Sequence, residues 1–245
     1  QAAQAQNTAT VLIGLGGTGI DALRTIKTQV HSRLKPDDPE AVVPEYAHIR
    51  FLGVDTAEMN GNAPGANQAA NNVNTQNNLA DMDVMMLDSS EFFSIAHRDV
   101  KKALLGGAGL KTRHELDWLC WERIPIPNLS KAGAGGIRQV GRFMMMDKSQ
   151  EFMARLKNEI NAAKCGLQDP QVNIHIFTGL SGGTGAGCFL DVCYMVRNVA
   201  KDVGTVTTFG YFFLPDVNLE KIPVSDTATR AYVPQNGYVA MQELD

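Results

Sequence analysis

Two glycine-rich segments, each placed between an apolar run and a helical pattern, constrain the fold most strongly. Residues 14–19 read Gly-Leu-Gly-Gly-Thr-Gly and follow the apolar run 9–13. Residues 181–187 read Ser-Gly-Gly-Thr-Gly-Ala-Gly and follow the run 172–177, which is rich in β-branched residues. Apolar residues recur at helical spacing after both segments, so each predicts a strand, a tight turn and a helix.

The rest of the chain continues this alternation of strand and helix. Apolar runs at 49–54 and 205–214 predict two further strands, and the pattern from about residue 138 to 163 predicts a long helix. Residues 235–245 are expected to form the first turns of another helix. Strands that alternate with helices through short turns form mostly parallel sheets with both faces covered. The sequence therefore predicts a three-layer, Rossmann-like α/β fold.

Three segments lie outside this pattern. Residues 60–78 are crowded with Asn, Gln, Ala and Gly, which predicts an exposed or mobile loop. Residues 82–105 are expected to be mostly helical, with Asp88 and Glu91 spaced as a variant of the capping box. Residues 116–121 carry both tryptophans of the chain, and packing beneath a loop is favoured there over a patch that docks a partner.

Composition narrows the classes of protein to consider. The chain has 245 residues, 44% of them hydrophobic, which supports a substantial core. Its net charge of −4 is opposite in sign to that of most nonspecific nucleic-acid or anionic-membrane binders. The four cysteines form no C-x-x-C pair and the five histidines are scattered, so neither a metal site nor a disulfide framework is predicted. No apolar run approaches the ~20 residues of a membrane span, and a soluble cytoplasmic protein is expected.

Glycine at a junction between a parallel strand and the following helix is typical of phosphate binding. Unpaired N–H groups and the positive end of the helix dipole attract anions there, and glycine lets the backbone approach a phosphate closely. Ligands of open α/β sheets lie beyond the carboxyl ends of the strands, where both glycine segments are placed. A third glycine patch at 133–136 precedes the predicted helix 138–163. The sequence therefore predicts a phosphate-binding site at this edge of the sheet.

The first glycine segment alone also fits an NAD-dependent oxidoreductase. Its Gly-x-Gly-x-x-Gly spacing matches the dinucleotide fingerprint, in which an acidic residue about 20 positions further on binds the ribose. Asp55 lies about twice as far along the chain as that spacing requires. Neither glycine segment carries the Lys-Ser/Thr pair of a Walker A loop. The oxidoreductase hypothesis leaves residues 181–187 unexplained.

The segment 181–187 resembles the signature loop of tubulins, Gly-Gly-Gly-Thr-Gly-Ser/Thr-Gly. The resemblance to the tubulin/FtsZ superfamily, and most to its bacterial tubulin-like branch, covers nearly the whole chain in matching order. Residues 13–19 are similar to the first nucleotide loop of FtsZ, and 51–56 to its second strand and following loop. Residues 133–142 resemble the third, γ-phosphate-sensing loop, and 212–216 stand where the sugar-binding loop is expected.

This resemblance implies a site for GTP or GDP with Mg²⁺, built from these loops. It assigns no residue as a metal ligand and no catalytic residue. The residues implied to bind the nucleotide are Gly16, Gly17 and Thr18 at the α- and β-phosphates, Ser181, Gly182, Gly183, Thr184 and Gly185 around the β-phosphate, Ala134, Gly135, Gly136 and Arg142 near the γ-phosphate, Asp55 in the second loop, Asp216 at the ribose, and Asp21 and Asn236 at the base.

Several of these side chains have alternatives. Arg138 could supply the positive charge near the γ-phosphate in place of Arg142, or both could be ordinary solvent-exposed helix arginines. Glu220 is an alternative to Asp216 at the ribose. Asn236 could read the purine edge or be an ordinary asparagine at a helix N-terminus.

The resemblance also implies a mode of action. Residues 1–234 would form the GTP-binding domain, and 235–245 would begin a central helix that leads to a second domain outside this chain. No water-activating residue is found, so hydrolysis of GTP to GDP and phosphate would need an acidic loop from a neighbouring subunit. Subunits that share a site head to tail continue as a filament, in which the nucleotide controls assembly. A non-polymerising, nucleotide-sensing scaffold is the alternative.

Overall fold

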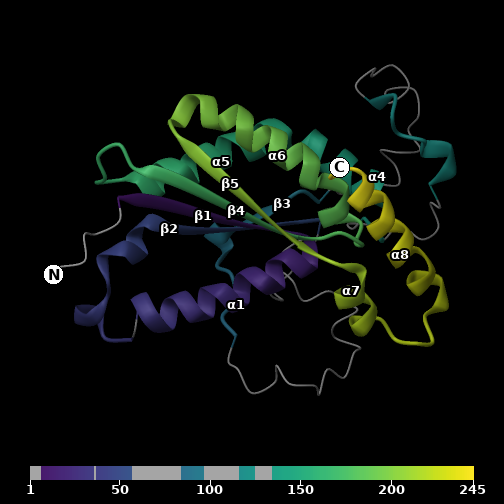
Figure 1. Cartoon of the computed structure of the whole chain (residues 1–245), viewed down its shortest axis with the longest axis horizontal. Coiled ribbons are helices and arrows are strands. Elements are labelled where there is room, and N and C mark those ends of the chain that lie inside the picture. The colour runs from purple at the N-terminus through teal and green to yellow at the C-terminus, as the bar shows by residue number, and fades with distance from the viewer. Residues whose placement is uncertain (1–6, 36, 57–83, 97–115, 125–133) are drawn as a thin grey trace.

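The computed structural model describes residues 7–35, 37–56, 84–96, 116–124 and 134–245. Its centre is a parallel sheet of five strands in the order β3-β2-β1-β4-β5. Helices cover both faces of this sheet (Figure 1). The strands are β1 (Thr8–Leu15), β2 (Ile49–Asp55), β3 (Phe92–Ser94), β4 (Gln171–Gly179) and β5 (Val206–Phe213). The α/β fold, three layers around a parallel sheet, is therefore confirmed.

The helices divide between the two faces and one edge of the sheet. Helix α1 (Gly16–Leu34) covers one face, while α5 (Ser149–Lys164) and α6 (Thr184–Val203) cover the other (Figure 1). The remaining helices lie toward the carboxyl ends of the strands (Figure 1). These are α4 (Arg138–Asp147), α7 (Pro215–Lys221) and α8 (Thr227–Gln242), and short 3-10 turns span Pro39–Ala41, Pro44–His48, Ser89–Glu91 and Trp121–Arg123.

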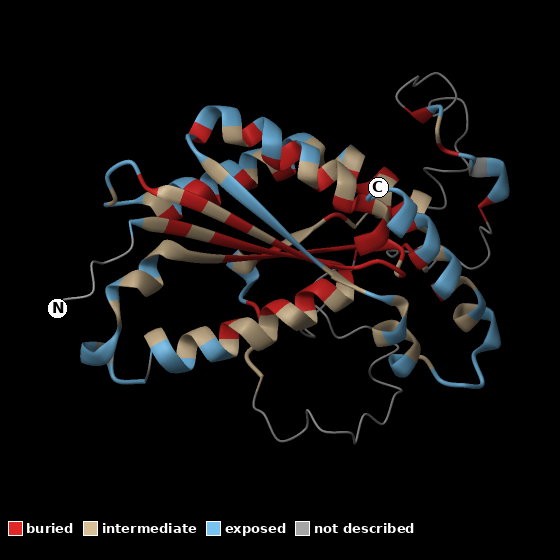
Figure 2. Cartoon of the chain, viewed as in Figure 1, coloured by how far each residue is buried: buried red, intermediate tan, exposed pale blue. Residues whose placement is uncertain are grey.

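Alternation along the central strands explains the layers. In β4, Val172, Ile174 and Ile176 are buried in the larger core, which also contains Phe152 of α5 and Val192 of α6. Phe177 belongs instead to the smaller core beneath α1, together with residues such as Ile20 and Leu23. Figure 2 shows the buried residues concentrated in the central strands and on the helix surfaces that face them. Burial of both sheet faces is the expected result for parallel strands.

One of the expected helices is replaced by other structure in the described part of its range. Within the described part of 82–105, residues 89–91 form a 3-10 turn and Phe92–Ser94 form β3, so a mostly helical segment is wrong there. The capping box is confirmed, because the Asp88 N–H donates to Glu91 Oε2 at 2.8 Å. Pairing of β3 with the edge of β2 decides the outcome, since aromatic residues favour an extended backbone once a partner strand is present.

Boundaries also differ near the third glycine patch and near the end of the chain. The single helix expected over 138–163 is two helices, α4 and α5, which meet at Lys148. The last helix begins at Thr227, eight residues before the expected start, and Asp226 caps it by accepting from the Thr229 N–H. Pro234 lies inside α8, although proline cannot donate the backbone hydrogen bond of a helix interior. The loop expected over 60–78 lies outside the described residues.

A buried lysine fastens the segment before β3 to α1. The Lys27 side chain is 2% exposed, and its Nζ donates to Glu91 Oε2 at 2.6 Å and to Asp88 Oδ2 at 3.3 Å. Nζ also donates to the backbone carbonyl of Met86. Burial alone would lower the pKa of Lys27, but the two carboxylates raise it above its ordinary value. Lys27 therefore stays charged and holds the edge of the sheet in place.

Replacing this lysine should destabilise the fold strongly. We expect Lys27→Met to lower the free energy of unfolding by about 3 kcal/mol, because the variant leaves the Glu91 carboxylate without its cation. Urea denaturation followed by circular dichroism measures the change. Lys157→Met is the matched control, since Lys157 pairs with Asp202 on the surface and should contribute less than about 1 kcal/mol. Equal losses in the two variants would contradict this account.

Candidate functional site

Four loops meet at the carboxyl ends of β1, β2 and β4. We call them the first loop (residues 14–19), the second loop (55–56), the third loop (134–137) and the fourth loop (179–185). The first and fourth loops include the first residues of α1 and α6, and the third loop leads directly into α4. Three helix N-termini therefore point at one edge of the sheet, which is where open α/β sheets bind their ligands.

Glycine permits the first and fourth loops to touch. Gly16 has a φ of +66°, and a Cβ placed on it would lie 2.9 Å from the amide nitrogen of Gly185. A Cβ on Gly185 would lie 2.8 Å from the carbonyl oxygen of Leu15. Both separations are shorter than any that real side chains tolerate. The two β-to-α junctions therefore form one continuous backbone surface, with Thr18 and Thr184 on the same cluster of loops.

The third loop packs as tightly against the fourth. A Cβ on Gly183 would lie 2.8 Å from the amide nitrogen of Ile137 and 2.9 Å from that of Gly136. Further along, α4 and α6 approach through Gly141 and Gly187, where a Cβ would overlap backbone carbonyl oxygens of the facing segment. The N-termini of α4 and α6 are therefore held side by side, which brings two positive helix ends together.

Buried polar groups join the second loop to its neighbours. Asp55 Oδ1 accepts from the backbone N–H of Thr56 at 2.7 Å and lies 3.3 Å from its Oγ1. The Thr56 and Thr184 hydroxyl oxygens are 3.0 Å apart, and the Ala134 N–H donates to Thr56 Oγ1 at 3.4 Å. Burial raises the pKa of the Asp55 carboxyl above its ordinary value, although hydrogen bonds from Thr56 and Thr184 oppose the shift.

One buried hydroxyl at the fourth loop has no partner among the described residues. Ser181 is 2% exposed, and its Oγ makes no hydrogen bond within the described part of the chain. Its backbone carbonyl accepts from Asn236 Nδ2 at 3.0 Å, and the same nitrogen donates to the carbonyl of Gly136 at 2.9 Å. A buried polar atom without a partner is costly, which makes Ser181 Oγ a candidate to bind a ligand.

Asn236 belongs to α8 and joins the third loop to the fourth. It lies well inside α8, so the alternative of an asparagine at a helix N-terminus is wrong. Its amide nitrogen joins the third and fourth loops, which contribute the carbonyl groups that it contacts. Asn236 is therefore placed at the predicted site, while its nitrogen is engaged by protein.

Asn218 is a site residue that the sequence analysis missed. Thr18 Oγ1 donates to Asn218 Oδ1 at 2.8 Å, which ties the first loop to α7. Asn218 Nδ2 is the nearest atom to a Cβ placed on Gly182, at 3.9 Å, so the amide faces the fourth loop at van der Waals distance. The contact joins residues 200 positions apart. No local pattern could have signalled it.

The charged residues predicted at the site are engaged by protein or lie at its rim. Arg142 donates to both carboxylate oxygens of Asp191, and its guanidinium lies 4.4 Å from the ring centre of Trp118. Arg138 donates to the Ala186 carbonyl and pairs with Glu243 of the segment after α8. Neither guanidinium is therefore a free solvated group. Asp21 Oδ2 accepts from Lys221 Nζ at 2.9 Å. The two acidic residues predicted at the ribose, Asp216 and Glu220, are exposed, as is Gly135 of the third loop.

Trp118 itself packs against the larger core. This agrees with the predicted role of Trp118, which is packing beneath a loop. The side chain of Trp121 lies outside the described part of the chain.

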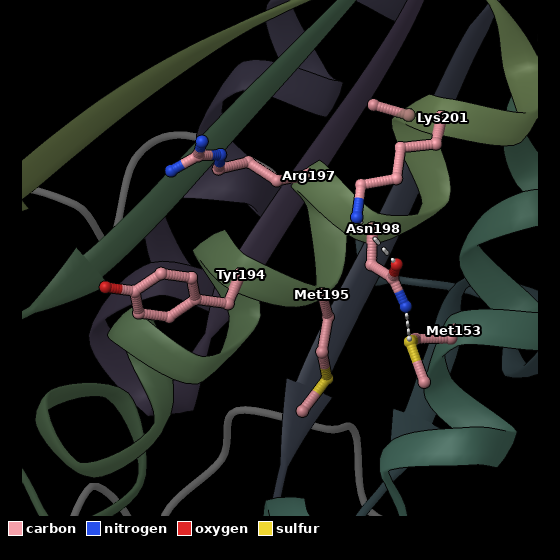
Figure 3. A pocket seen from close by; sticks show the side chains of 7 residues that line it. Met153, Tyr194, Met195, Arg197, Asn198 and Lys201 are labelled. Atoms are coloured by element: carbon pink, nitrogen blue, oxygen red, sulfur yellow. Dashed lines mark hydrogen bonds between the residues drawn. The ribbon is translucent and has the colours of Figure 1, made fainter.

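An open groove of about 790 Å³ lies away from these loops, between α5 and α6 (Figure 3). Met153, Tyr194, Arg197 and Lys201 are among the side chains that line it. Arg197 is thirteen residues beyond Thr184, or about 20 Å along the helix. Within the described ranges, no helix is both long and apolar enough to cross a membrane, and no group of three or more His, Cys, Asp or Glu side chains could hold a metal ion.

Comparison with known proteins agrees with this geometry. The family described as "Tubulin like" matches residues 11–245, which is nearly the whole chain. The chain belongs to the tubulin-like family. The family resemblance inferred from the glycine segments is thereby confirmed, and all four loops of this tubulin-like chain fall within the matched region.

Two further comparisons were with solved structures and with curated proteins. A solved structure, CetZ1 from Haloferax volcanii, described as a GDP-bound monomer, shares 12% sequence identity with the tubulin-like chain at a TM-score of 0.47. The alignment covers 96% of this chain and 47% of CetZ1, so the chain spans about half the length of that structure. No match was found among curated proteins.

Two neighbouring glycines of the fourth loop should respond differently to alanine. Gly183→Ala should destabilise the fold, by about 2 kcal/mol, because its Cβ would overlap backbone atoms of the third loop. Gly182→Ala should leave stability unchanged, because the nearest atom would be 3.9 Å away. Thermal unfolding of both variants checks the prediction, and similar melting temperatures for the two would contradict it.

Proposed function

We propose that this chain binds GTP and GDP, with the phosphates held by the first, third and fourth loops. One observation carries the proposal: three helix N-termini converge where glycines let the loop backbones touch, and the buried Ser181 hydroxyl there has no partner among the described residues. Backbone N–H groups and helix dipoles oriented in this way favour a polyphosphate. Membership of the tubulin-like family supports a nucleotide as the ligand.

In this proposal, each loop binds a different part of the polyphosphate. Gly16, Gly17 and Thr18 would line the α- and β-phosphates, and residues 182–185 would cradle the β-phosphate with backbone N–H groups. The third loop, next to Gly183, would meet the terminal phosphate. Because Asp191 and Trp118 engage Arg142, backbone groups supply most of the positive potential in this proposal.

The rest of the nucleotide would lie toward α7 and α8. Asn218 and Asp216 of α7 are suited to the ribose, because Asn218 Nδ2 faces the fourth loop and Asp216 is exposed. Asn236 Oδ1 accepts no hydrogen bond from the described residues, and an acceptor suits the N–H groups of guanine. Asp21, held by Lys221, would lie at the outer edge of the base.

Mg²⁺ would be carried mainly by the phosphates. This ion usually takes one or two carboxylates and completes its shell with phosphate oxygens and water. The buried Asp55, with its raised pKa and its hydrogen bonds from Thr56, does not resemble a dedicated ligand. When bound, the ion would neutralise phosphate charge, and this chain's own residues would position the nucleotide.

The proposed consequence of GTP binding is head-to-tail assembly into cytoplasmic filaments. No residue of the described site is placed to activate water, so hydrolysis in this proposal needs an acidic loop from a neighbouring subunit. Without such a partner, the chain would be a nucleotide-sensing scaffold. Identification with the bacterial branch of the family belongs to the same proposal.

Calorimetry with four nucleotides tests the binding proposal. We expect GTP and GDP to bind more tightly than ATP, with no detectable binding of NAD, because the loops are arranged for a polyphosphate and α8 for guanine. Gly182→Ala should weaken GTP binding by about tenfold or more, since the added methyl enters the phosphate surface. The Lys157→Met variant serves as a folded control. Binding of NAD in preference to GTP would favour the oxidoreductase hypothesis and overturn the proposal.

Sedimentation tests assembly separately from binding. GTP should increase the fraction of protein that pellets, and GDP should not, if the terminal phosphate orders a contact between subunits. Identical pelleting with and without GTP, in a protein that binds GTP, would favour the scaffold.

A further inference from the structure

Thr56 connects more of the site than any other side chain of the second loop. It follows the last residue of β2 and is 4% exposed. Its hydroxyl oxygen lies 3.0 Å from that of Thr184 in the fourth loop and accepts from the Ala134 N–H of the third loop at 3.4 Å. A single buried oxygen therefore joins three loops that are far apart in the sequence.

The hydrogens available to this cluster restrict how it can be arranged. A threonine hydroxyl has one hydrogen to donate and two lone pairs that accept. If Thr56 donates to Asp55 Oδ1, the Thr184 hydroxyl is left to donate to Thr56 and cannot donate to a ligand. If Thr56 donates to Thr184, the Thr184 hydroxyl can donate either to the Asp55 carboxyl or to a ligand.

Only the second arrangement suits an anion at the fourth loop. The bonds then run in one direction, from the Ala134 N–H to Thr56, from the Thr56 O–H to Thr184, and from the Thr184 O–H to the anion. Hydrogen bonds in such a chain polarise one another and strengthen together. Asp55 keeps its bond from the Thr56 backbone N–H at 2.7 Å in both arrangements. The switch therefore costs the carboxylate its 3.3 Å contact with Thr56 Oγ1 and its hydrogen bond from Thr184.

We propose that Thr56 is a positioning residue that aligns the Thr184 hydroxyl with the bound phosphates and holds the third loop against the fourth, so that its hydroxyl sets the preference for nucleoside triphosphate over diphosphate. This inference rests on the proposed function and deepens it. Thr56 touches no phosphate itself in this account; it acts through Thr184 and through Ala134.

The arrangement of the loops explains why the longer ligand depends more on Thr56. The fourth loop opens α6, and the third loop opens α4 beside it, with Gly136 and Ile137 amide nitrogens next to Gly183. A diphosphate can be held by the first and fourth loops, which contact each other directly through Gly16 and Gly185. A third phosphate group reaches toward α4, whose loop is tied to the second loop through the Ala134 N–H. Loss of the Thr56 hydroxyl therefore removes support mainly from the triphosphate.

Two substitutions at this position separate the hydroxyl from the side-chain volume. Thr56→Val removes the hydroxyl and nearly keeps the shape, whereas Thr56→Ser keeps the hydroxyl and removes a methyl group. Calorimetry with GTP and with GDP should show that Thr56→Val weakens GTP binding by about tenfold and GDP binding by less than about threefold. Thr56→Ser should restore the ratio of the two affinities to within about threefold of the unmodified chain.

Thr28→Val is the matched control. Thr28 Oγ1 also joins two segments, since it donates to the Arg24 carbonyl and accepts from the Met85 N–H, but it lies in the second half of α1, away from the loops. This variant should lose stability without changing the ratio of GTP to GDP affinity. If Thr56→Val fails to fold, Thr56→Ala and Thr56→Ser form the second pair, and the ratio should fall in the alanine variant alone.

Each result decides between the two proposals. If the unmodified chain binds neither GTP nor GDP, the proposed function is wrong. If it binds both and the ratio is unchanged when the hydroxyl is removed, the function stands and the role of Thr56 is overturned. A ratio that falls equally in the serine variant would assign the effect to packing of the methyl group, and would also overturn it.

Discussion

Close contact between two backbones is the constraint on which the rest of the site depends. The first loop can reach the fourth only because Gly16 and Gly185 carry no side chains where a Cβ would meet a backbone nitrogen or oxygen. The parallel register of β1 and β4 brings the strand ends level, with Leu15 opposite Thr178. Strand pairing therefore sets the position of the loops, and glycine lets them close the distance that remains.

Much of this arrangement could be predicted from sequence because it is local. A glycine segment between a strand and a helix carries its own geometry, so the first and fourth loops were placed correctly by residues 14–19 and 181–187. The parallel sheet followed from the alternation of strands and helices. The weaker predictions concerned β3 and α8, where pairing with β2 overrode a helical pattern at Phe92 and where a helix continued through Pro234.

The contacts that the sequence could not supply are those made across long separations. Asn218 meets Thr18 and Thr56 meets Thr184 because all four residues lie beyond the carboxyl ends of strands in one sheet, and neither pair has a motif. The same reason explains the arginines. Arg142 was expected near a phosphate on the basis of its place in a loop motif, but Asp191 and the ring of Trp118 engage its guanidinium. A sequence shows which residues are charged, but it does not show which group each charged side chain contacts.

Helix α8 joins the site at more than one point along its length. Asn236 holds the carbonyls of Gly136 and Ser181, and the ion pair between Arg138 and Glu243 ties the chain just beyond the helix to the start of α4. Because α8 is attached at two places, it cannot rotate about one attachment alone. A shift of the third loop would therefore move the whole helix. The opposite flank of α8 presents Tyr238 and Met241 to solvent. These exposed side chains would therefore change position together with the third loop.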